Sequence, residues 1–181
     1  MSNDLLAFTI AWNVIFIELL VFCCVLVLLA MLFIWFERKV RRQFFLMNYE
    51  YVLKHKKLIL YINSKSKSLA DTYLMLAVSS FEVGEELDFE NYVNKANDEK
   101  NQIAVLYWKC YFYFFKQQKE NFDTYFYLLK NSEESEWRNK YVRTIEILLK
   151  KRNGENLLPE ELEVINQTVS KKMKEYVNSA R

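Results

Sequence analysis

Glycine and proline are scarce in this sequence. Its 181 residues include 2 glycines and 1 proline. Tight hairpins, Gly-rich phosphate loops and most sheet connections depend on these two residue types. Their scarcity argues against such structures and favours helices joined by short polar turns. We therefore expect an all-α fold.

Histidine and cysteine are also scarce. His55 is the single histidine, and its neighbours are lysines rather than cysteines or carboxylates. Of the three cysteines, Cys23 and Cys24 lie in an apolar run and Cys110 in an apolar stripe, which favours a packing role. No phosphate-binding loop, H-E-x-x-H or G-x-S-x-G motif occurs. We expect no metal, no cofactor and no enzymatic activity.

One long apolar run dominates the N-terminal part of the chain. The eighteen residues from Leu19 to Phe36 contain no charged or strongly polar side chain. As a helix they span about 27 Å, close to the bilayer hydrocarbon thickness of about 30 Å. A soluble helix would carry polar residues along one side, and this run has none. Because the apolar character continues upstream, we expect one transmembrane helix over about residues 10–36.

The position of Glu18 relative to the bilayer stays open. If the bilayer covers only Leu19–Phe36, Glu18 lies at the outer headgroup boundary. If the bilayer covers more of the upstream residues, Glu18 lies inside it. An ionisable group there normally faces a partner or a water path. Glu18 is therefore a candidate partner-binding residue.

Cations follow the apolar run directly, whereas no Lys or Arg precedes it. The positive-inside rule then predicts a single-pass protein of the cell membrane, with its N-terminus outside and its C-terminal part cytoplasmic. A cleaved signal peptide is not expected, because the N-terminal region is not basic, the apolar run is too long and no small-residue cleavage site precedes the charges. The chain thus divides into an anchor segment, 1–42, and an all-helical cytoplasmic domain, 43–181.

The four cations after the run are expected to contact anionic membrane lipid. They are Arg38, Lys39, Arg41 and Arg42. Basic residues just cytoplasmic of a span gain about 1 kcal/mol each near an anionic surface. Nucleic-acid binding is the other use of such a cluster. Since membrane proximity explains the charge without it, we expect no nucleic-acid partner.

The remaining residues predict seven helices in antiparallel succession, from apolar residues that recur at steps of three and four. The expected helices cover about residues 43–62, 69–83, 88–100, 103–115, 122–129, 133–152 and 159–176, the first continuing the anchor helix. Gly84 and Gly154 are the expected C-terminal stops of two of them. Trp137 is among the residues expected to face inward, and Phe45 is expected to share one helical face with Tyr49, Val52, Lys56 and Ile59.

The aromatic segment Tyr111–Phe115 offers a second candidate partner site. Its five neighbouring aromatic residues cover all sides of a helix. Phe112 and Tyr113 therefore point away from Tyr111 and Phe114, towards either a second packing layer or an exposed binding face. Phe112 and Tyr113 are candidate partner-binding residues on the second alternative.

Part of the cytoplasmic domain resembles a tetratricopeptide repeat. The matching residues are Tyr73, Leu76, Ala77, Gly84, Val93 and Ala96. Two further units, Leu106–Lys130 and Trp137–Thr168, are similar in their hydrophobic steps. Phe89 departs from the pattern, because it stands where a small residue is expected, and no proline closes the unit. The resemblance implies a helical-hairpin bundle or short solenoid that grips a peptide or a partner helix on one face.

These expectations combine into one leading function and one alternative. The leading prediction is a membrane-anchored cytoplasmic adaptor, without catalytic activity, that binds an unidentified protein partner near the inner leaflet. The alternative is a small integral subunit of a larger membrane complex, in which the transmembrane helix with Glu18 makes the functional contacts.

Overall fold

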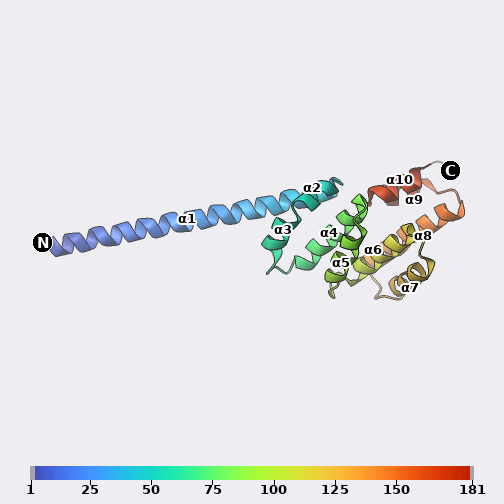
Figure 1. Ribbon diagram of the computed structural model, residues 1–181, viewed down its shortest axis with the longest axis horizontal. Coiled ribbons are helices and arrows are strands. Elements are labelled where there is room, and N and C mark those ends of the chain that lie inside the picture. Colours follow the sequence, from blue (N-terminus) through green and yellow to red (C-terminus); the bar gives the residue numbers. More distant parts are fainter. Residues whose placement is uncertain (1–2, 180–181) are drawn as a thin grey trace. The chain divides into compact units, whose positions relative to one another are not determined.

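The computed structural model describes the backbone of residues 3–179 and the side chains of residues 12–179. The described part of the chain is helical and contains no β-strand (Figure 1), which confirms the all-α prediction. The chain divides into two compact units, one up to Lys39 and one from Val40 onward. The helices are α1 (Asn3–Phe45), α2 (Tyr49–Lys54), α3 (Lys56–Asn63), α4 (Leu69–Val83), α5 (Glu86–Lys95), α6 (Gln102–Phe115), α7 (Lys119–Lys130), α8 (Glu136–Asn153), α9 (Pro159–Asn166) and α10 (Lys171–Asn178).

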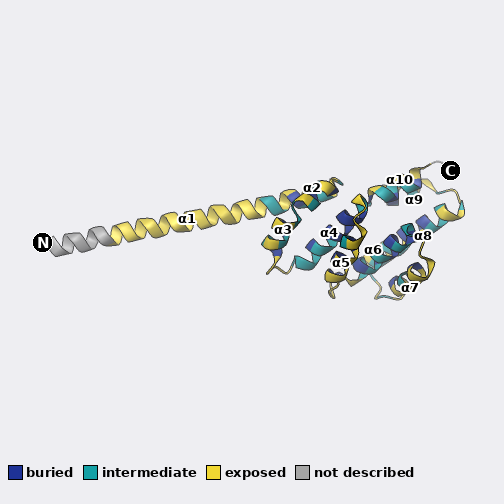
Figure 2. Cartoon of the chain, viewed as in Figure 1, coloured by how far each residue is buried: buried dark blue, intermediate teal, exposed yellow. Residues whose placement is uncertain are grey.

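Helix α1 contains the apolar run. Its stretch Trp12–Phe45 is long and apolar enough to cross a membrane, and among the described residues no other helix has this length and composition. Every side chain from residue 12 to residue 35 is exposed, as the continuous yellow of α1 shows (Figure 2). The side chains of residues 10 and 11, at the start of the expected span, lie outside the described side chains. An apolar surface exposed on all sides is typical of a helix whose solvent is lipid.

The second unit is built from helical hairpins. Helix α4 packs against α5, α6 against α7, and α8 against α9. The first helices of these hairpins also contact one another, α4 with α6 and α6 with α8. In the view of Figure 1, α7 lies below α6 and α8, whereas α9 and α10 lie above them. Helices α4, α6 and α8 therefore form a row in the middle of the unit.

Local sequence signals explain where several helices end. Helix α4 has its predicted bounds and stops at Gly84, which takes the left-handed conformation at φ +92°. Helix α8 stops in the same way at Gly154, with φ +89°. Glycine adopts this conformation without steric cost, so both predicted stops are confirmed. At its other end, α8 is capped by the hydroxyl of Ser135, which accepts a hydrogen bond from the backbone N–H of Arg138 at 3.1 Å.

Two predicted helices are broken in the structure. The chain turns after α1, where Met47 is left-handed at φ 59° and the Asn48 side chain caps α2. Ser170 caps a new helix, α10, inside the segment 159–176. Each cap accepts a hydrogen bond from a backbone N–H group that, in a continuous helix, would donate to the carbonyl four residues earlier. The described part of the second unit therefore holds nine helices, α2–α10, where seven were predicted. Because α1 ends at this turn, Phe45 is 65% exposed, whereas Tyr49 and Val52, which a continuous helix would place on the same face, are buried.

An aromatic cluster forms the centre of the second unit. Phe81 of α4 contacts Phe89 of α5 at a ring-centroid distance of 5.7 Å, and Tyr111 of α6 at 5.3 Å. Phe112 of α6 stacks on Phe89 at 4.4 Å and is 3% exposed. Figure 2 shows buried residues on α4 and α6 accordingly. Burial of side chains of this size is a main source of the unit's stability.

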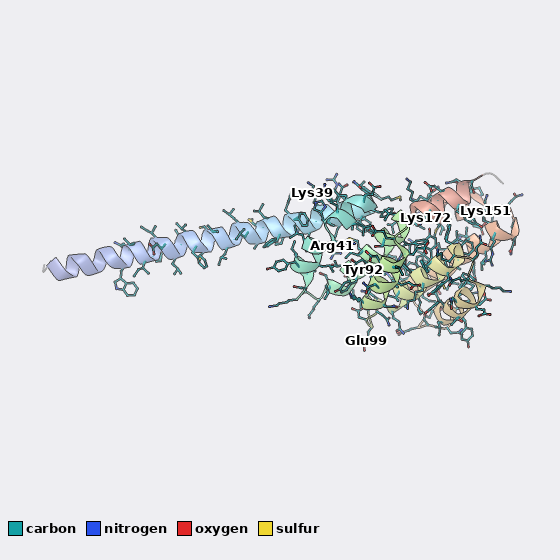
Figure 3. The ribbon with its side chains drawn as sticks, viewed as in Figure 1. Lys39, Arg41, Tyr92, Glu99, Lys151 and Lys172 are labelled. Atoms are coloured by element: carbon teal, nitrogen blue, oxygen red, sulfur yellow. The ribbon has the colours of Figure 1, made fainter. Side chains whose placement is uncertain are left out.

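A polar network ties the start of α10 to α4 and α6. The hydroxyl of Ser170, which is fully buried, donates to the Glu82 carboxylate and accepts from the Tyr111 hydroxyl. The amine of Lys172 (Figure 3) donates to the carbonyl of Phe81 at 2.5 Å. In the same region, the Tyr49 hydroxyl of α2 donates to the carbonyl of Val169. The last helix is therefore fixed against elements from the beginning of the unit.

Candidate functional site: an aromatic groove

A cavity of about 500 Å³ opens on the second unit. Its apolar lining is rich in aromatic side chains, namely Phe44, Phe45, Tyr107, Trp108, Trp137 and Tyr141. Charged residues also line it, Arg41, Asp71 and Lys140. A concave, mainly apolar surface with a few polar groups is the usual form of a binding site. We call this cavity the aromatic groove.

Helical spacing places the lining residues on one side of the row α4, α6 and α8. Leu74 and Val78 of α4 lie four residues apart, as do Trp137 and Tyr141 of α8. Residues four apart lie on the same face of a helix. Helix α6 lies between them and supplies neighbouring aromatic residues. The end of α1 and the connection between α9 and α10, residues 167–169, complete the groove.

The aromatic rings form a buried floor and an exposed rim. Tyr107 stacks on Tyr141 with ring centroids 4.3 Å apart, and Trp137 lies 6.0 Å from Tyr141. Tyr107 is 3% exposed and Trp108 is 6% exposed, whereas Trp137 is 63% exposed. Burial raises the pKa of both Tyr107 and Tyr141, so both hydroxyls stay neutral at physiological pH. The floor of the groove is therefore uncharged.

The rim of the groove carries a net positive charge. Burial disfavours the charged form of Asp71, but hydrogen bonds from Asn101 and Lys100 outweigh this effect and lower its pKa. The Asp71 carboxylate accepts from Lys100 at 3.0 Å and from Asn101 at 2.9 Å. The charge of Arg41 also lowers the pKa of Asp71, and together with Lys140 the three charged lining residues sum to one positive charge.

The structure brings one of the predicted lipid-contact residues to the groove. Arg41 (Figure 3) is half-buried and lines it, whereas Arg38, Lys39 and Arg42 are exposed on α1. The amine of Lys39 lies 5.0 Å from the ring of Trp35. Arg41 can thus contact a groove ligand.

The predicted partner-binding residues lie elsewhere. Glu18 is exposed on α1. Phe112 occupies a second packing layer, one of its two predicted alternatives, and offers little surface to a partner. Tyr113 is half-buried and stacks on Tyr125 of α7 at 5.4 Å. None of the three lines the aromatic groove.

Sequence reasoning missed the groove mainly because of Trp137. We expected Trp137 to face inward, and this prediction is wrong, since the residue lies in the first turn of α8, before the helix reaches the core. Trp137, Tyr141, Ile145 and Leu148 recur at four, four and three, so the spacing places the exposed Trp137 on the same stripe as the buried Ile145 and Leu148. No sequence signal separated Trp137 from the buried residues.

Neither a metal site nor a related protein points to another function. Within residues 12–179, no group of three or more His, Cys, Asp or Glu side chains could hold a metal ion. Comparisons with protein-family models, with characterised proteins and with solved structures each found no match. The aromatic groove is the candidate functional site of the described residues.

Proposed function

We propose that this chain is a single-pass membrane protein whose second unit is an adaptor that binds a segment of a partner protein in the aromatic groove. The observation that carries the proposal is the groove itself, with a neutral aromatic floor and two cations at its rim. The long apolar helix α1 and the cations after it support anchorage with the second unit on the cytoplasmic side of the cell membrane.

The arrangement of the hairpins supports a polypeptide ligand. In solenoids of paired helices, the first helices of successive pairs line a common face, and a peptide or helix binds there. Helices α4, α6 and α8 line the groove in this way. We therefore propose that the three tetratricopeptide-like units correspond to the pairs α4–α5, α6–α7 and α8–α9.

The chemistry of the lining defines the ligand further. Trp137 presents a large ring surface at the rim, and the ammonium of Lys140 lies 5.6 Å from that ring. Tryptophan and tyrosine dominate binding energy where they can be buried by a partner. Lys140, which is exposed, favours a carboxylate beside the apolar contact. The proposed ligand is an acidic segment with at least one large apolar side chain.

Site-specific cross-linking tests the proposal. A photoreactive phenylalanine replaces Trp137 in the full chain, in the cells that produce it, and Tyr127 of α7 is the matched control position. Tyr127 is 69% exposed, close to the 63% of Trp137, but lies outside the groove. We expect a cross-linked partner at position 137 and none at position 127. Equal cross-linking at both positions contradicts the proposal.

Substitutions at the rim should lower partner capture by a measurable factor. Trp137→Ala should lower partner capture by the full chain at least tenfold, which corresponds to about 1.4 kcal/mol, and Lys140→Glu should lower it in the same direction. Tyr127→Ala should leave capture unchanged. Capture that survives Trp137→Ala would show that the partner binds elsewhere.

Glu18 favours a second candidate, a subunit of a larger membrane complex. Its side chain is exposed on a helix whose surrounding residues are apolar. A carboxyl group in a lipid-facing position is costly unless another chain supplies a partner. In this second proposal, α1 makes the functional contacts.

A further inference from the structure

Helix α3 presents a surface that the proposed adaptor function does not use. Its exposed residues are Lys57, Leu58 and Tyr61, and they lie opposite the buried Ile59 and Asn63. Tyr61 is 73% exposed and Leu58 is 42% exposed. Three further exposed lysines flank this face. We call the set Lys54, Lys57, Leu58, Tyr61, Lys65 and Lys67 the α3 surface.

The lysines of the α3 surface form no ion pair with a carboxylate within residues 12–179. Residues 51–70 contain no Asp or Glu. Lys56 differs from these lysines, because its amine contacts Asp88 at 2.8 Å and Glu85 at 4.0 Å. Glu85 and Asp88 thus engage Lys56, and the four lysines of the α3 surface have no ion-pair partner among residues 12–179.

The combination of residue types selects a lipid surface over other polyanions. Leu58 and Tyr61 are three residues apart, so their side chains lie side by side on the helix. Tyrosine prefers the headgroup level of a bilayer, where its ring and hydroxyl meet apolar and polar surroundings. A nucleic acid would use the lysines but would leave Leu58 without an apolar partner.

Chain connectivity keeps the α3 surface near the bilayer. Only residues 37–53 separate the apolar run, which ends at Phe36, from Lys54. Attraction of lysines to an anionic surface acts within a Debye length of about 8–10 Å. The lysines of the α3 surface, held by this short connection, can lie within that distance of the bilayer.

We propose that the α3 surface docks the second unit on an anionic lipid bilayer, with Leu58 and Tyr61 entering the headgroup region and the four lysines contacting lipid phosphates and carboxylates. This inference rests on the proposed membrane anchorage, but not on the aromatic groove. It adds a second membrane contact, separate from Arg38, Lys39 and Arg42 on α1.

Fluorescence quenching in vesicles tests the docking. The full chain with Cys23→Ala, Cys24→Ala and Tyr61→Cys is labelled with an environment-sensitive fluorophore and reconstituted into vesicles. Cys110 stays, because it is 0% exposed. The matched control carries Tyr127→Cys. Each vesicle set contains a lipid with a nitroxide at the headgroup, in phosphatidylcholine either alone or with phosphatidylserine.

We expect quenching at position 61 to be at least twofold stronger than at position 127 in vesicles with phosphatidylserine. It should fall to the level of position 127 in phosphatidylcholine alone or in 0.5 M salt. The paired substitutions Lys57→Glu and Lys65→Glu should lower quenching at position 61 to the level at position 127. The control pair Lys119→Glu and Lys171→Glu, which changes the net charge equally at exposed positions, should not.

Three results would overturn the inference. One is equal quenching at positions 61 and 127 in every lipid, and another is quenching at position 61 that does not depend on phosphatidylserine. The third is a response at position 61 to added duplex DNA but not to anionic lipid, which would assign the surface to nucleic acid. Flotation of the labelled chain with its vesicles checks anchorage separately, so a failed anchor is distinguishable from a failed α3 surface.

Discussion

Glu82 connects the end of α4 to the start of α10 through a half-buried carboxylate. One oxygen accepts from the Ser170 hydroxyl, and the other accepts from the backbone N–H of Lys172 at 3.0 Å. Burial raises the pKa of Glu82 above its ordinary value of 4.5, although these hydrogen bonds and the Lys172 charge act in the opposite direction. The folded protein therefore binds a proton at Glu82 more tightly than the unfolded chain does.

This difference predicts how pH changes stability at one residue. The contribution of Glu82 to the free energy of unfolding is largest below pH 4.5 and falls as pH rises through the higher folded-state pKa. Glu82→Gln removes the titration. Relative to this variant, the native protein should therefore be more stable near pH 4.5 than at neutral pH. Urea unfolding of the full chain at several pH values, followed by tryptophan fluorescence, measures the difference.

Glu90→Gln on α5 is the control for this measurement, because it removes an exposed carboxyl group outside the network. Its stability relative to the native protein should change less with pH than that of Glu82→Gln. A Glu82→Gln variant whose relative stability is constant across the whole range would contradict the argument.

At the scale of single elements, Gly84 controls the passage from α4 to α5. Its φ of +92° is unfavourable for any residue with a Cβ atom, and an added Cβ would meet no other atom within 4 Å. The cost of Gly84→Ala is therefore conformational rather than steric. We expect a loss of about 1 kcal/mol in the free energy of unfolding.

Gly84→Asn is the matched comparison, because asparagine tolerates the left-handed conformation better than alanine does. Its loss of unfolding free energy should be smaller than that of Gly84→Ala. If both variants unfold at the same urea concentration as the native protein, the turn does not depend on glycine.

The elements that could be predicted are those specified by nearby residues. The bounds of α4 were predicted correctly at both ends, because its apolar spacing lies within the helix and Gly84 follows it directly. The break before α10 was missed although Ser170, which accepts a hydrogen bond from the backbone N–H of Met173 at 3.0 Å, is a local N-cap signal. The contact that fixes this end of α10, from Ser170 to Glu82, joins residues 88 positions apart and leaves no local pattern.

The aromatic groove was less predictable than the helices for a related reason. It combines residues from the end of α1, from α4, α6 and α8, and from the segment before α10. Sequence spacing identifies which residues share a face of one helix. It does not show which faces of separate helices meet. The stacking of Tyr107 on Tyr141 at 4.3 Å, across α6 and α8, is therefore visible only in the structure.

At the scale of the whole molecule, the two units allow the two proposed functions to be separated. Exchange of residues 12–36 for an unrelated apolar span of the same length should leave partner capture at position 137 unchanged if the second unit is the adaptor. Capture should be lost if α1 makes the functional contacts. Co-purification of the cross-linked partner from membranes measures this.

Glu18→Gln within the native span is the control for the exchange. It keeps the helix and its length and removes only the ionisable group. The adaptor proposal expects full capture from this variant. Loss of capture from both Glu18→Gln and the exchanged chain would favour the integral-subunit proposal instead.

The contact between Tyr49 and Val169 has a consequence for synthesis on the ribosome. These residues are 120 positions apart, so their hydrogen bond cannot form until the intervening chain has been translated. At 5–20 residues per second this interval lasts roughly 6–24 s. Until α10 is synthesised, Phe114 and Phe115 lack the cover that Tyr176 of α10 gives them in the finished protein. A ribosome that stalls before Ser170 would therefore leave an aggregation-prone nascent fragment, and the timing of translation becomes part of how this protein reaches its native state.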